Sequence, residues 1–324
     1  MTNEIINQII QNEPLAGLTT MKVGGSARYF VRVQSAVELV EVVQYALKKK
    51  WPYFVLGGGS NVIISDTGFD GLVIKNEATE VLVDAVHSIV QADSGARVGK
   101  VAAQSASAGL SGAEFYFGIP GTIGGAVYGN AGLRGHETAD ILKDAILLTE
   151  RDGKAIVVKR SASWFEYTYR DSRLKRARLA GEQTPVLVSA RLQLYPARSE
   201  VILSRTQEFL GHRKGGSMAG GGQHGWQPTG LACAGCIFQN PSTDPEMAAG
   251  RLLDQAGVKR LRKGGAAVAK EHANFIYNKR NATARDIYSL IEQARDRVRT
   301  KFDVDLELEV ELIGQFTSHE APPA

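Results

Sequence analysis

The sequence predicts a mixed α/β protein of the α+β class, and two segments carry this prediction. In the first, a strand pattern at 29–33, a helical pattern at 36–49 and a strand pattern at 53–57 follow one another directly. In the second, helical spacing at 283–298 precedes strict alternation of apolar and acidic residues at 304–312. Because helices repeat every 3.6 residues and strands every two, both element types are expected in both segments.

Each predicted element has a local signature. The first helix ends in Lys48, Lys49 and Lys50, where cations suit the helix dipole. Thr283 and Asp286 form a capping-box pattern at the start of the last helix. The final strand is expected to turn its apolar residues toward a core and to present Asp305, Glu307, Glu309 and Glu311 on one polar face. Apolar runs between turn-forming residues predict further short strands at 61–65, 71–75, 81–83, 145–149, 155–158 and 186–194.

Length and composition favour a globular protein with more than one packed unit. The chain has 324 residues, of which 44% are hydrophobic and 22% charged, close to globular averages. The first 14 residues lack the basic start of an export signal, and the two long stretches without charges, 115–133 and 215–243, are rich in glycine. We therefore expect no membrane insertion, and the two cysteines favour a reducing, cytoplasmic location.

The charge pattern points to a small anionic ligand at most. The net charge is only +4, although residues 259–301 hold twelve Lys or Arg against four Asp or Glu. This cluster is typical of solvated helix faces, and an anionic small-molecule site is the second interpretation. Nucleic acid is not expected as a partner, because aromatic residues are not interleaved with the charges.

Two glycine-rich loops suggest a long ligand held at two places. The first, at 57–61, follows a strand directly, and its three glycines let backbone N–H groups approach a diphosphate. The second spans 118–126. The first loop has neither the Walker pattern nor the G-x-G-x-x-G pattern. A sharp surface turn would also explain one such run, but the presence of two favours a dinucleotide.

Seven motifs occur in order along the chain. They are PLAGLTTMKVGGSA (14–27), VLGGGSNVIISDTGFDGLVI (55–74), LSGAEFYFGIPGTIGGAVYGNAG (110–132), EYTYRDSRLK (166–175), AGCIFQNP (234–241), GGAAVAKEHANFIYNKRNATARDI (264–287) and LELEVELIG (306–314). Together they resemble the UDP-N-acetylenolpyruvoylglucosamine reductase family, FAD enzymes of bacterial cell-wall precursor synthesis. The resemblance covers roughly residues 14–314.

The resemblance implies a two-lobed FAD-binding region of the vanillyl-alcohol-oxidase or PCMH type, at 1–77 and 78–200. A C-terminal α+β domain at 201–314 would bind the UDP-sugar, and 315–324 would be a flexible tail. The diphosphate of FAD would lie on Gly57, Gly58, Gly59, Ser60, Asn61 and Val62. Its ring would lie near Ile119, Pro120, Gly121, Thr122, Gly124, Gly125 and Ala126.

The family's reaction uses NADPH and UDP-N-acetylglucosamine enolpyruvate. A hydride passes through FAD to C3 of the enolpyruvyl group, and an acid protonates C2 to give UDP-N-acetylmuramate. The motifs match Arg170 to an arginine beside the substrate carboxylate and Glu309 to an acidic partner on the last strand. From the residues alone, a surface salt bridge is the stronger interpretation of Arg170 and a solvated strand face that of Glu309, and alternation does not choose Glu309 among its acidic neighbours. The motif match reverses this preference.

Cys236 stands where well-known members carry the serine that donates the proton. With an ordinary pKa near 8.5, a thiol is a stronger acid than an alcohol, so it can donate while it remains protonated. Cys233 and Cys236 also form a C-x-x-C pair, which we interpret neither as a metal site, since further ligands are lacking, nor as a thioredoxin-like motif. A narrower hypothesis is that oxidation joins the pair and removes the donor.

The C-terminal motifs supply candidate contacts to the UDP-sugar, namely Asn240, Lys263, Lys270, His272 and Asn274. For His272 a hydrogen-bonded structural role is the stronger interpretation. Glu311 stands where relatives commonly carry arginine, a departure that argues against an inherited anion contact at that position. Gln239, in place of the frequent lysine, is a milder change.

Two other functions fit parts of the pattern. The glycine loops alone suit an FAD-dependent oxidase of the same fold, and a non-catalytic flavin- or nucleotide-binding protein would need only the loops. The segment at 215–225 is expected to be a mobile loop. The sequence leaves the oligomeric state open.

Overall fold

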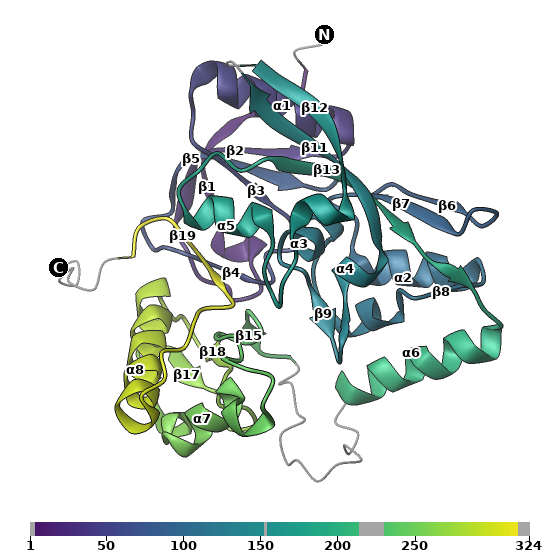
Figure 1. The fold of residues 1–324 in the computed structure, drawn as a ribbon. Coiled ribbons are helices and arrows are strands. Elements are labelled where there is room, and N and C mark those ends of the chain that lie inside the picture. The colour runs from purple at the N-terminus through teal and green to yellow at the C-terminus, as the bar shows by residue number, and fades with distance from the viewer. Residues whose placement is uncertain (1–3, 152–153, 214–229, 317–324) are drawn as a thin grey trace. The chain divides into compact units, whose positions relative to one another are not determined.

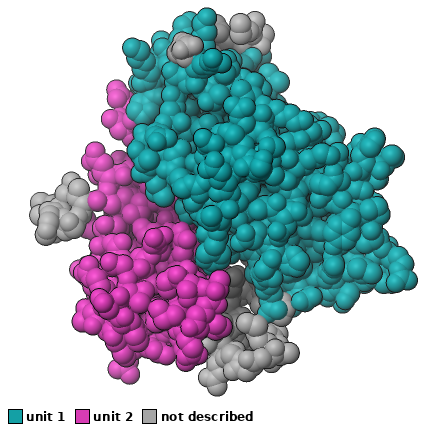
Figure 2. Space-filling model, viewed as in Figure 1, with its two compact units in different colours: residues 1–11, 29–58, 71–213 teal, residues 12–28, 59–70, 214–324 magenta. Residues whose placement is uncertain are grey.

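The computed structural model describes residues 4–151, 154–213 and 230–316 (Figure 1). The loop expected at 215–225 and most of the tail expected at 315–324 lie outside these residues. The chain divides into two compact units (Figure 2). The first unit comprises residues 1–11, 29–58 and 71–213, and the second comprises 12–28, 59–70 and 214–324.

A four-stranded sheet lies mostly in the first unit. Its order is β1 (Ile10–Pro14), β2 (Ser26–Val33), β5 (Phe69–Asn76) and β3 (Tyr53–Leu56), with β3 parallel to β5. The predicted helix is α1 (Ala36–Lys49). The side chain of its N-cap, Ser35, accepts the N–H of Glu38, and its C-cap, Lys50, has a φ of 55°. Its apolar face is buried against this sheet and against Leu148, Val186 and Val188.

A five-stranded antiparallel sheet forms the rest of the first unit. Its order is β12 (Lys154–Ser161), β11 (Leu142–Arg151), β13 (Val186–Gln193), β7 (Ile89–Asp93) and β6 (Val81–Asp84). Its core includes Phe115, Tyr116 and Phe165, all at most 1% exposed. The helices of this part are α2 (Val98–Ser107), α3 (Ile123–Tyr128), α4 (Thr138–Ile141), α5 (Arg173–Leu179) and α6 (Ser199–Arg213), and the short strands are β8 (Leu110–Ser111), β9 (Gly132–Leu133), β10 (His136–Glu137) and β14 (Tyr195–Pro196).

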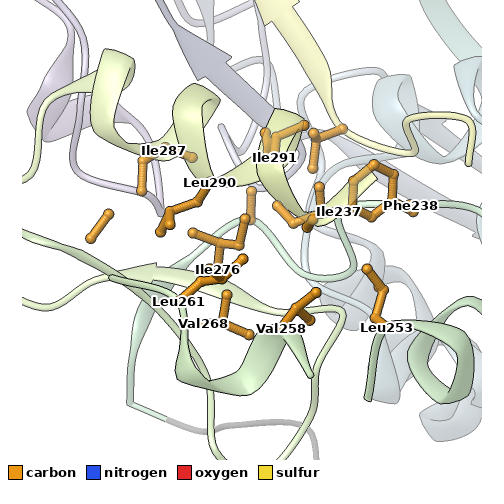
Figure 3. Packing of buried hydrophobic residues seen from close by; sticks show 14 of the residues in the cluster. Ile237, Phe238, Leu253, Val258, Leu261, Val268, Ile276, Ile287, Leu290 and Ile291 are labelled. Atoms are coloured by element: carbon orange, nitrogen blue, oxygen red, sulfur yellow. The ribbon is translucent and has the colours of Figure 1, made fainter. Parts of the chain in front are cut away.

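The second unit packs helices against a small sheet. The sheet order is β15 (Ala232–Cys233), β18 (Ile276–Asn278), β17 (Ala266–Val268) and β16 (Arg262–Lys263), all antiparallel. The helices are α7 (Ala249–Gln255) and α8 (Ala284–Phe302). Figure 3 shows Ile287, Leu290 and Ile291 of α8 pointing toward the sheet, where Ile276 and Val268 lie.

A two-stranded parallel sheet also belongs to the second unit. It pairs β4 (Val62–Ile64) with β19 (Glu311–Ile313), in the register Glu311 to Val62. Short 3₁₀ segments complete the elements, at Ile6–Gln8, Ala16–Leu18, Glu114–Gly118, Ala162–Phe165, Pro245–Met247 and Val258–Arg260.

The structure confirms most predicted elements and corrects one. All the predicted short strands are present, and α8 carries the expected capping box, with Thr283 Oγ1 accepting the N–H of Asp286 and the Asp286 carboxylate accepting the N–H of Thr283. The strand predicted over 304–312 is wrong in extent, because only 311–313 forms a ladder. Residues 304–310 are joined to the rest of the unit by single contacts, including an isolated bridge between Leu308 and Phe238. Inward and outward positions still alternate, with Leu306 and Val310 buried and Asp305 and Glu307 exposed.

None of the helices in the described segments combines the length and the apolar character needed to cross a lipid bilayer.

One partly buried ion pair links three strands of the five-stranded sheet. Arg191 of β13 holds the carboxylate of Asp144 on β11 with two N–H donors, one of them at 2.7 Å, and Lys159 of β12 lies 3.3 Å from the same carboxylate. The hydrogen bond from Arg191 is the main cause that lowers the pKa of Asp144 below its ordinary value. Folding therefore favours the ionised carboxylate.

We expect Asp144→Asn to lower the free energy of unfolding at pH 7 by about 1–2 kcal/mol, because a two-point charged contact becomes a neutral one. A depressed pKa stabilises the fold above the unfolded pKa of about 3.9 and ceases to do so as the pH falls through the folded value. Measured by urea unfolding, the difference between variant and wild type should therefore shrink steadily as the pH falls below about 3.9. Asp70→Asn, at an ion pair whose Asp70 side chain is 84% exposed, is the control and should change little. An Asp144→Asn deficit that does not shrink as the pH falls below about 3.9 would contradict this account.

Candidate functional site

The two glycine loops of the sequence touch each other in the first unit. A Cβ built on Gly57 would lie 2.5 Å from the hydroxyl of Thr122, in the second loop, so a larger residue at 57 would require Thr122 to shift. The carbonyl of Gly57 accepts a hydrogen bond from the ammonium of Lys75. Burial is the main cause that lowers the pKa of Lys75, and the carboxylate of Glu77 opposes it. A cation therefore lies directly beneath the predicted diphosphate loop.

The other half of the first loop is fixed within the second unit. Gly59 has a φ of 63°, and a Cβ there would lie 2.3 Å from the carbonyl oxygen of Leu18. Its own carbonyl accepts the N–H of Thr20 at 2.9 Å. Positive φ and close backbone packing both explain why this position is glycine. The neighbouring Gly58 is exposed, whereas Ser60 and Val62 are half-buried.

The second glycine loop leads into α3. Thr122 caps this helix, and the N–H groups of Ile123 and Gly124 donate to Ala96 and Ser94 at 2.8 and 2.7 Å. Gly125 lies in a more open environment, because a Cβ built on it would meet no protein atom within 4 Å. Its exposed backbone leaves room for a ligand to approach. Of the remaining residues predicted here, Ala126 is buried, Ile119 and Gly121 are half-buried and Pro120 is exposed.

These features fit FAD as a bound cofactor. The first loop offers glycine backbone beside the half-buried ammonium of Lys75 for a diphosphate, and Gly125 offers exposed backbone. In the parts of the chain that the structure describes, no group of three or more metal-ligating side chains is found.

Arg170 sits on a loop that is anchored to the end of α3. It has a φ of 54°, unusual for a residue with a Cβ, and its guanidinium donates to the carbonyl of Gly132 at 2.7 Å. The buried ammonium of Lys175 donates to the Arg170 carbonyl at 3.0 Å. Tyr167 and Ser172, on either side, donate their hydroxyls to the carbonyls of Val127 and Tyr128. The loop is thus held at both of its ends.

Sequence analysis missed Asn130, which organises this region. It is fully buried, has a φ of 46°, and donates to Thr168 of the Arg170 loop at 2.9 Å and to the Glu137 carboxylate at 2.8 Å. Its side-chain oxygen accepts the N–H of Ala139. The motif that contains it, GNAG, was a signal of a special position, but the contacts join distant segments that local patterns do not reveal.

In the second unit the structure brings Cys236 and Glu309 onto neighbouring segments. The N–H of Glu309 donates to the carbonyl of Ile237 at 2.8 Å, and the N–H of Gln239 donates to the backbone carbonyl of Glu307 at 2.9 Å. The side chain of Gln239 adds a bond to the Leu308 carbonyl at 3.1 Å. The residue after Cys236 is therefore bonded to Glu309 itself. Both Cys236 and Glu309 are half-buried.

Three predicted substrate residues hold backbone in place. Asn274 is 3% exposed, and its side-chain amide both donates to and accepts from the backbone of Phe238, at 2.8 and 2.9 Å. His272 accepts the N–H of Asn274 on its Nδ1 and packs edge-on against Phe275. Asn240 accepts the N–H of Ala249, the first residue of α7. Lys263 and Lys270, by contrast, are exposed.

Cys233 and Cys236 flank a tight turn at the end of β15. Gly235 between them has a φ of 82°, and its N–H interacts with the thiol of Cys233. Burial is the main cause that raises the pKa of the Cys233 thiol, and this hydrogen bond opposes it. Cys233 is therefore held as a thiol at neutral pH.

Comparisons with known proteins agree with this arrangement. A model of FAD-binding domains matches residues 27–159, and one described as the C-terminal domain of UDP-N-acetylenolpyruvoylglucosamine reductase matches 227–313. The reductase of Carboxydothermus hydrogenoformans is 35% identical over 97% of each chain, and that of Bacillus subtilis is 36% identical over 95% of each. The crystal structure of the reductase from Thermus caldophilus superimposes with a TM-score of 0.73 at 33% identity, covering 94% of this chain and 98% of that one.

The chain belongs to the UDP-N-acetylenolpyruvoylglucosamine reductase family. The predicted resemblance and the predicted fold class are confirmed, with an FAD-binding region preceding the C-terminal domain of the reductase family. Both parts of these reductases are present in one chain.

The space at Gly125 gives a direct test of where the cofactor lies. Gly125→Ala adds a methyl group that meets no protein atom within 4 Å, so thermal unfolding of the apoprotein should be unchanged or slightly delayed. If FAD approaches this backbone, its dissociation constant should rise about tenfold or more, by titration of flavin fluorescence. Gly59→Ala is the comparison, since its Cβ would collide with the Leu18 carbonyl and should destabilise the apoprotein itself. Unchanged FAD affinity in Gly125→Ala would rule out close contact there.

The raised pKa of Cys233 predicts slow alkylation. In a Cys236→Ala variant, iodoacetamide should modify Cys233 more slowly at pH 8 than it modifies a cysteine in an unstructured peptide, because less of the thiol is ionised. The rate should continue to rise at pH values where the peptide has reached its plateau. Mass spectrometry of the proteolytic fragment that contains Cys233 measures the alkylation rate at each pH. If the alkylation rate of Cys233 reached half of its maximum at or below the pH found for the unstructured peptide, the raised pKa of Cys233 would be contradicted.

Proposed function

We propose that this protein catalyses the NADPH-dependent reduction, through FAD, of UDP-N-acetylglucosamine enolpyruvate to UDP-N-acetylmuramate in peptidoglycan precursor synthesis. The observation that carries the proposal is the 35% identity to a reductase of this name over 97% of each chain, which includes both the flavin loops and the C-terminal motifs. Bound FAD supplies hydride transfer from NADPH to the enolpyruvyl carbon C3.

The residues of the two glycine loops are proposed to hold FAD. Gly57, Gly58, Gly59, Ser60, Asn61 and Val62 would take its diphosphate, and Ile119, Pro120, Gly121, Thr122, Gly124, Gly125 and Ala126 would line its ring. The contact between Gly57 and Thr122 supports a shared role for the two loops, and the Lys75 ammonium adds positive charge below the first.

Arg170 is proposed to stabilise negative charge on the substrate carboxylate as hydride arrives. A planar guanidinium suits a carboxylate because it donates two parallel hydrogen bonds. The anchored loop supports this role, since a cation held in place before the reaction costs little reorganisation when charge develops.

Cys236 is proposed to donate the proton to C2, with Glu309 as its acidic partner. The balance of the reaction is one hydride to C3 and one proton to C2, so a group that starts protonated is required. The hydrogen bond between the Glu309 N–H and the Ile237 carbonyl supports a joint role, because it fixes the two segments side by side.

Asn240, Lys263, Lys270, His272 and Asn274 are proposed to shape the part of the site that takes the UDP-sugar. The exposed ammonium groups of Lys263 and Lys270 would contact the substrate diphosphate. The contacts of Asn240, His272 and Asn274 support a role in shaping the loops around the substrate.

Three broader assignments accompany this function. By analogy with the family we assign 1–77 and 78–200 to the FAD lobes, 201–314 to the UDP-sugar domain and 315–324 to a flexible tail. We propose that the protein is cytoplasmic, because NADPH is available in the cytoplasm and both thiols remain reduced there. Its partners would be small molecules and not nucleic acid, because the net charge is only +4.

The function is tested anaerobically. NADPH should bleach the yellow protein, and UDP-N-acetylglucosamine enolpyruvate should then restore the colour with formation of UDP-N-acetylmuramate. Restoration only on admission of air would indicate an oxidase instead. A flavin that NADPH never bleaches would indicate a binding protein without this chemistry.

Removal of the proposed donor should affect one half-reaction only. In Cys236→Ala, bleaching by NADPH should be unchanged, whereas reoxidation by substrate should slow by about 10²–10⁴-fold, the usual contribution of a general acid. In the wild type, reoxidation should slow as the pH rises and the thiol ionises, because a thiolate has no proton to donate. Cys236→Ser keeps a hydroxyl that stays protonated and should lose this pH dependence. Identical pH profiles for wild type and Cys236→Ser would contradict the role of the thiol.

A further inference from the structure

Both backbone groups of Glu309 are bonded outside any strand ladder. Its N–H donates to the carbonyl of Ile237 at 2.8 Å, and its carbonyl accepts the side-chain amide of Asn61 at 2.9 Å. Glu309 lies in a bend between the bridge at Leu308 and the strand that begins at Glu311. These two bonds therefore fix its backbone where regular pairing does not.

Asn61 contacts this bend from both sides. While its side chain donates to the Glu309 carbonyl, its own backbone carbonyl accepts the N–H of Glu311 at 2.9 Å. One residue of the diphosphate loop thus spans the bend, and it does so between positions 248 residues apart in the chain. The exposure of the acidic residues agrees, since Asp305 and Glu307 are exposed and Glu309 is half-buried.

We propose that Asn61 is a positioning residue for Glu309. Its amide fixes the peptide from which the carboxylate projects, so that the flavin loop and the acid-bearing segment keep one relative geometry within the second unit. Without this donor the Glu309 carbonyl loses the hydrogen bond from Asn61 and the bend relaxes. This inference rests on the proposed function, in which Glu309 assists protonation of C2, and it adds a role to a residue otherwise assigned to FAD alone.

The amide of Asn61 has two N–H donors, and the bond to Glu309 uses one. The second can serve a phosphate oxygen of the cofactor. A positioning role and a cofactor role therefore predict different losses, the first in the step that protonates the substrate and the second in FAD affinity.

The test measures the two half-reactions of Asn61→Ala separately, by anaerobic stopped flow with saturating FAD. Reduction by NADPH should stay within about twofold of wild type, while reoxidation by UDP-N-acetylglucosamine enolpyruvate should slow by about 10- to 100-fold, the effect of misplacing a reacting group by about 1 Å. The dissociation constant of FAD, measured by fluorescence, should rise less than about tenfold.

A double-mutant cycle with Glu309→Gln shows whether Asn61 acts through Glu309. In the Glu309→Gln background, Asn61→Ala should slow reoxidation by less than about twofold further, because the group that it positions is already inactive. Additive effects of the two substitutions would overturn the proposal. So would equal slowing of both half-reactions, or a variant that NADPH cannot reduce even at saturating FAD.

Asn278→Ala is the matched control in the same unit. Its amide donates to backbone carbonyls of Met21 and Lys22, at 3.4 and 3.2 Å, and not to the Glu309 segment. It should lower the thermal midpoint without changing the ratio of the two half-reaction rates, and a change in that ratio as large as in Asn61→Ala would count against positioning. A wild-type protein that substrate cannot reoxidise would instead refute the proposed function, so the two failures are distinct.

Discussion

The parallel pairing of β4 with β19 is the constraint on which the second unit depends. It joins residues 62–64 to residues 311–313, and the bonds between Asn61, Glu309 and Glu311 continue it beyond the ladder. Because β4 follows the diphosphate loop directly, this pairing places the end of that loop in the same folding unit as the C-terminal motifs. The carboxylate of Asp66, two residues after β4, adds a further link by accepting the first two N–H groups of α8, at 2.8 and 2.9 Å. The proposed diphosphate loop and the segment of the proposed acid Glu309 are therefore connected by backbone geometry.

The two units hold their proposed functional groups by the same physical means. In the first, hydroxyl and amide side chains hold the Arg170 loop through backbone carbonyls, and the buried Lys175 ammonium bonds to the Arg170 carbonyl itself. In the second, Asn274 and Asn61 hold the segments that carry Cys236 and Glu309. Side-chain amides suit this task because they carry both donors and an acceptor, which can pair with groups that irregular backbone leaves open. Such supports let groups on loops keep a fixed geometry.

The sequence predicted the elements that depend on neighbouring residues, such as helices, helix caps and short strands. Helix α1, the capping box of α8 and the short strands followed from periodicity and turn residues, and the family followed from its motifs. Alternation at 304–312 located the buried face correctly but overstated the strand, since pairing depends on which segment lies alongside. It also could not distinguish Glu309 from Asp305 and Glu307, because their difference arises from Asn61 and Ile237 far away in the chain. The contacts of Asn130 were missed for the same reason, and those of Asn274 and Asn240 with backbone were not visible from their motifs.

The measurement that tests this account most directly is native-state hydrogen exchange of the wild-type protein at increasing, subdenaturing urea. If the β4–β19 pairing holds the second unit together, the amides of 62–64 and 311–313 should exchange with one common free energy of opening, shared with the core of α8. Exchange of 311–313 at the rate of a frayed chain end, while 62–64 stay protected, would show that the C-terminal segment opens by itself. The pairing could then not be what fixes Glu309 beside the flavin loop.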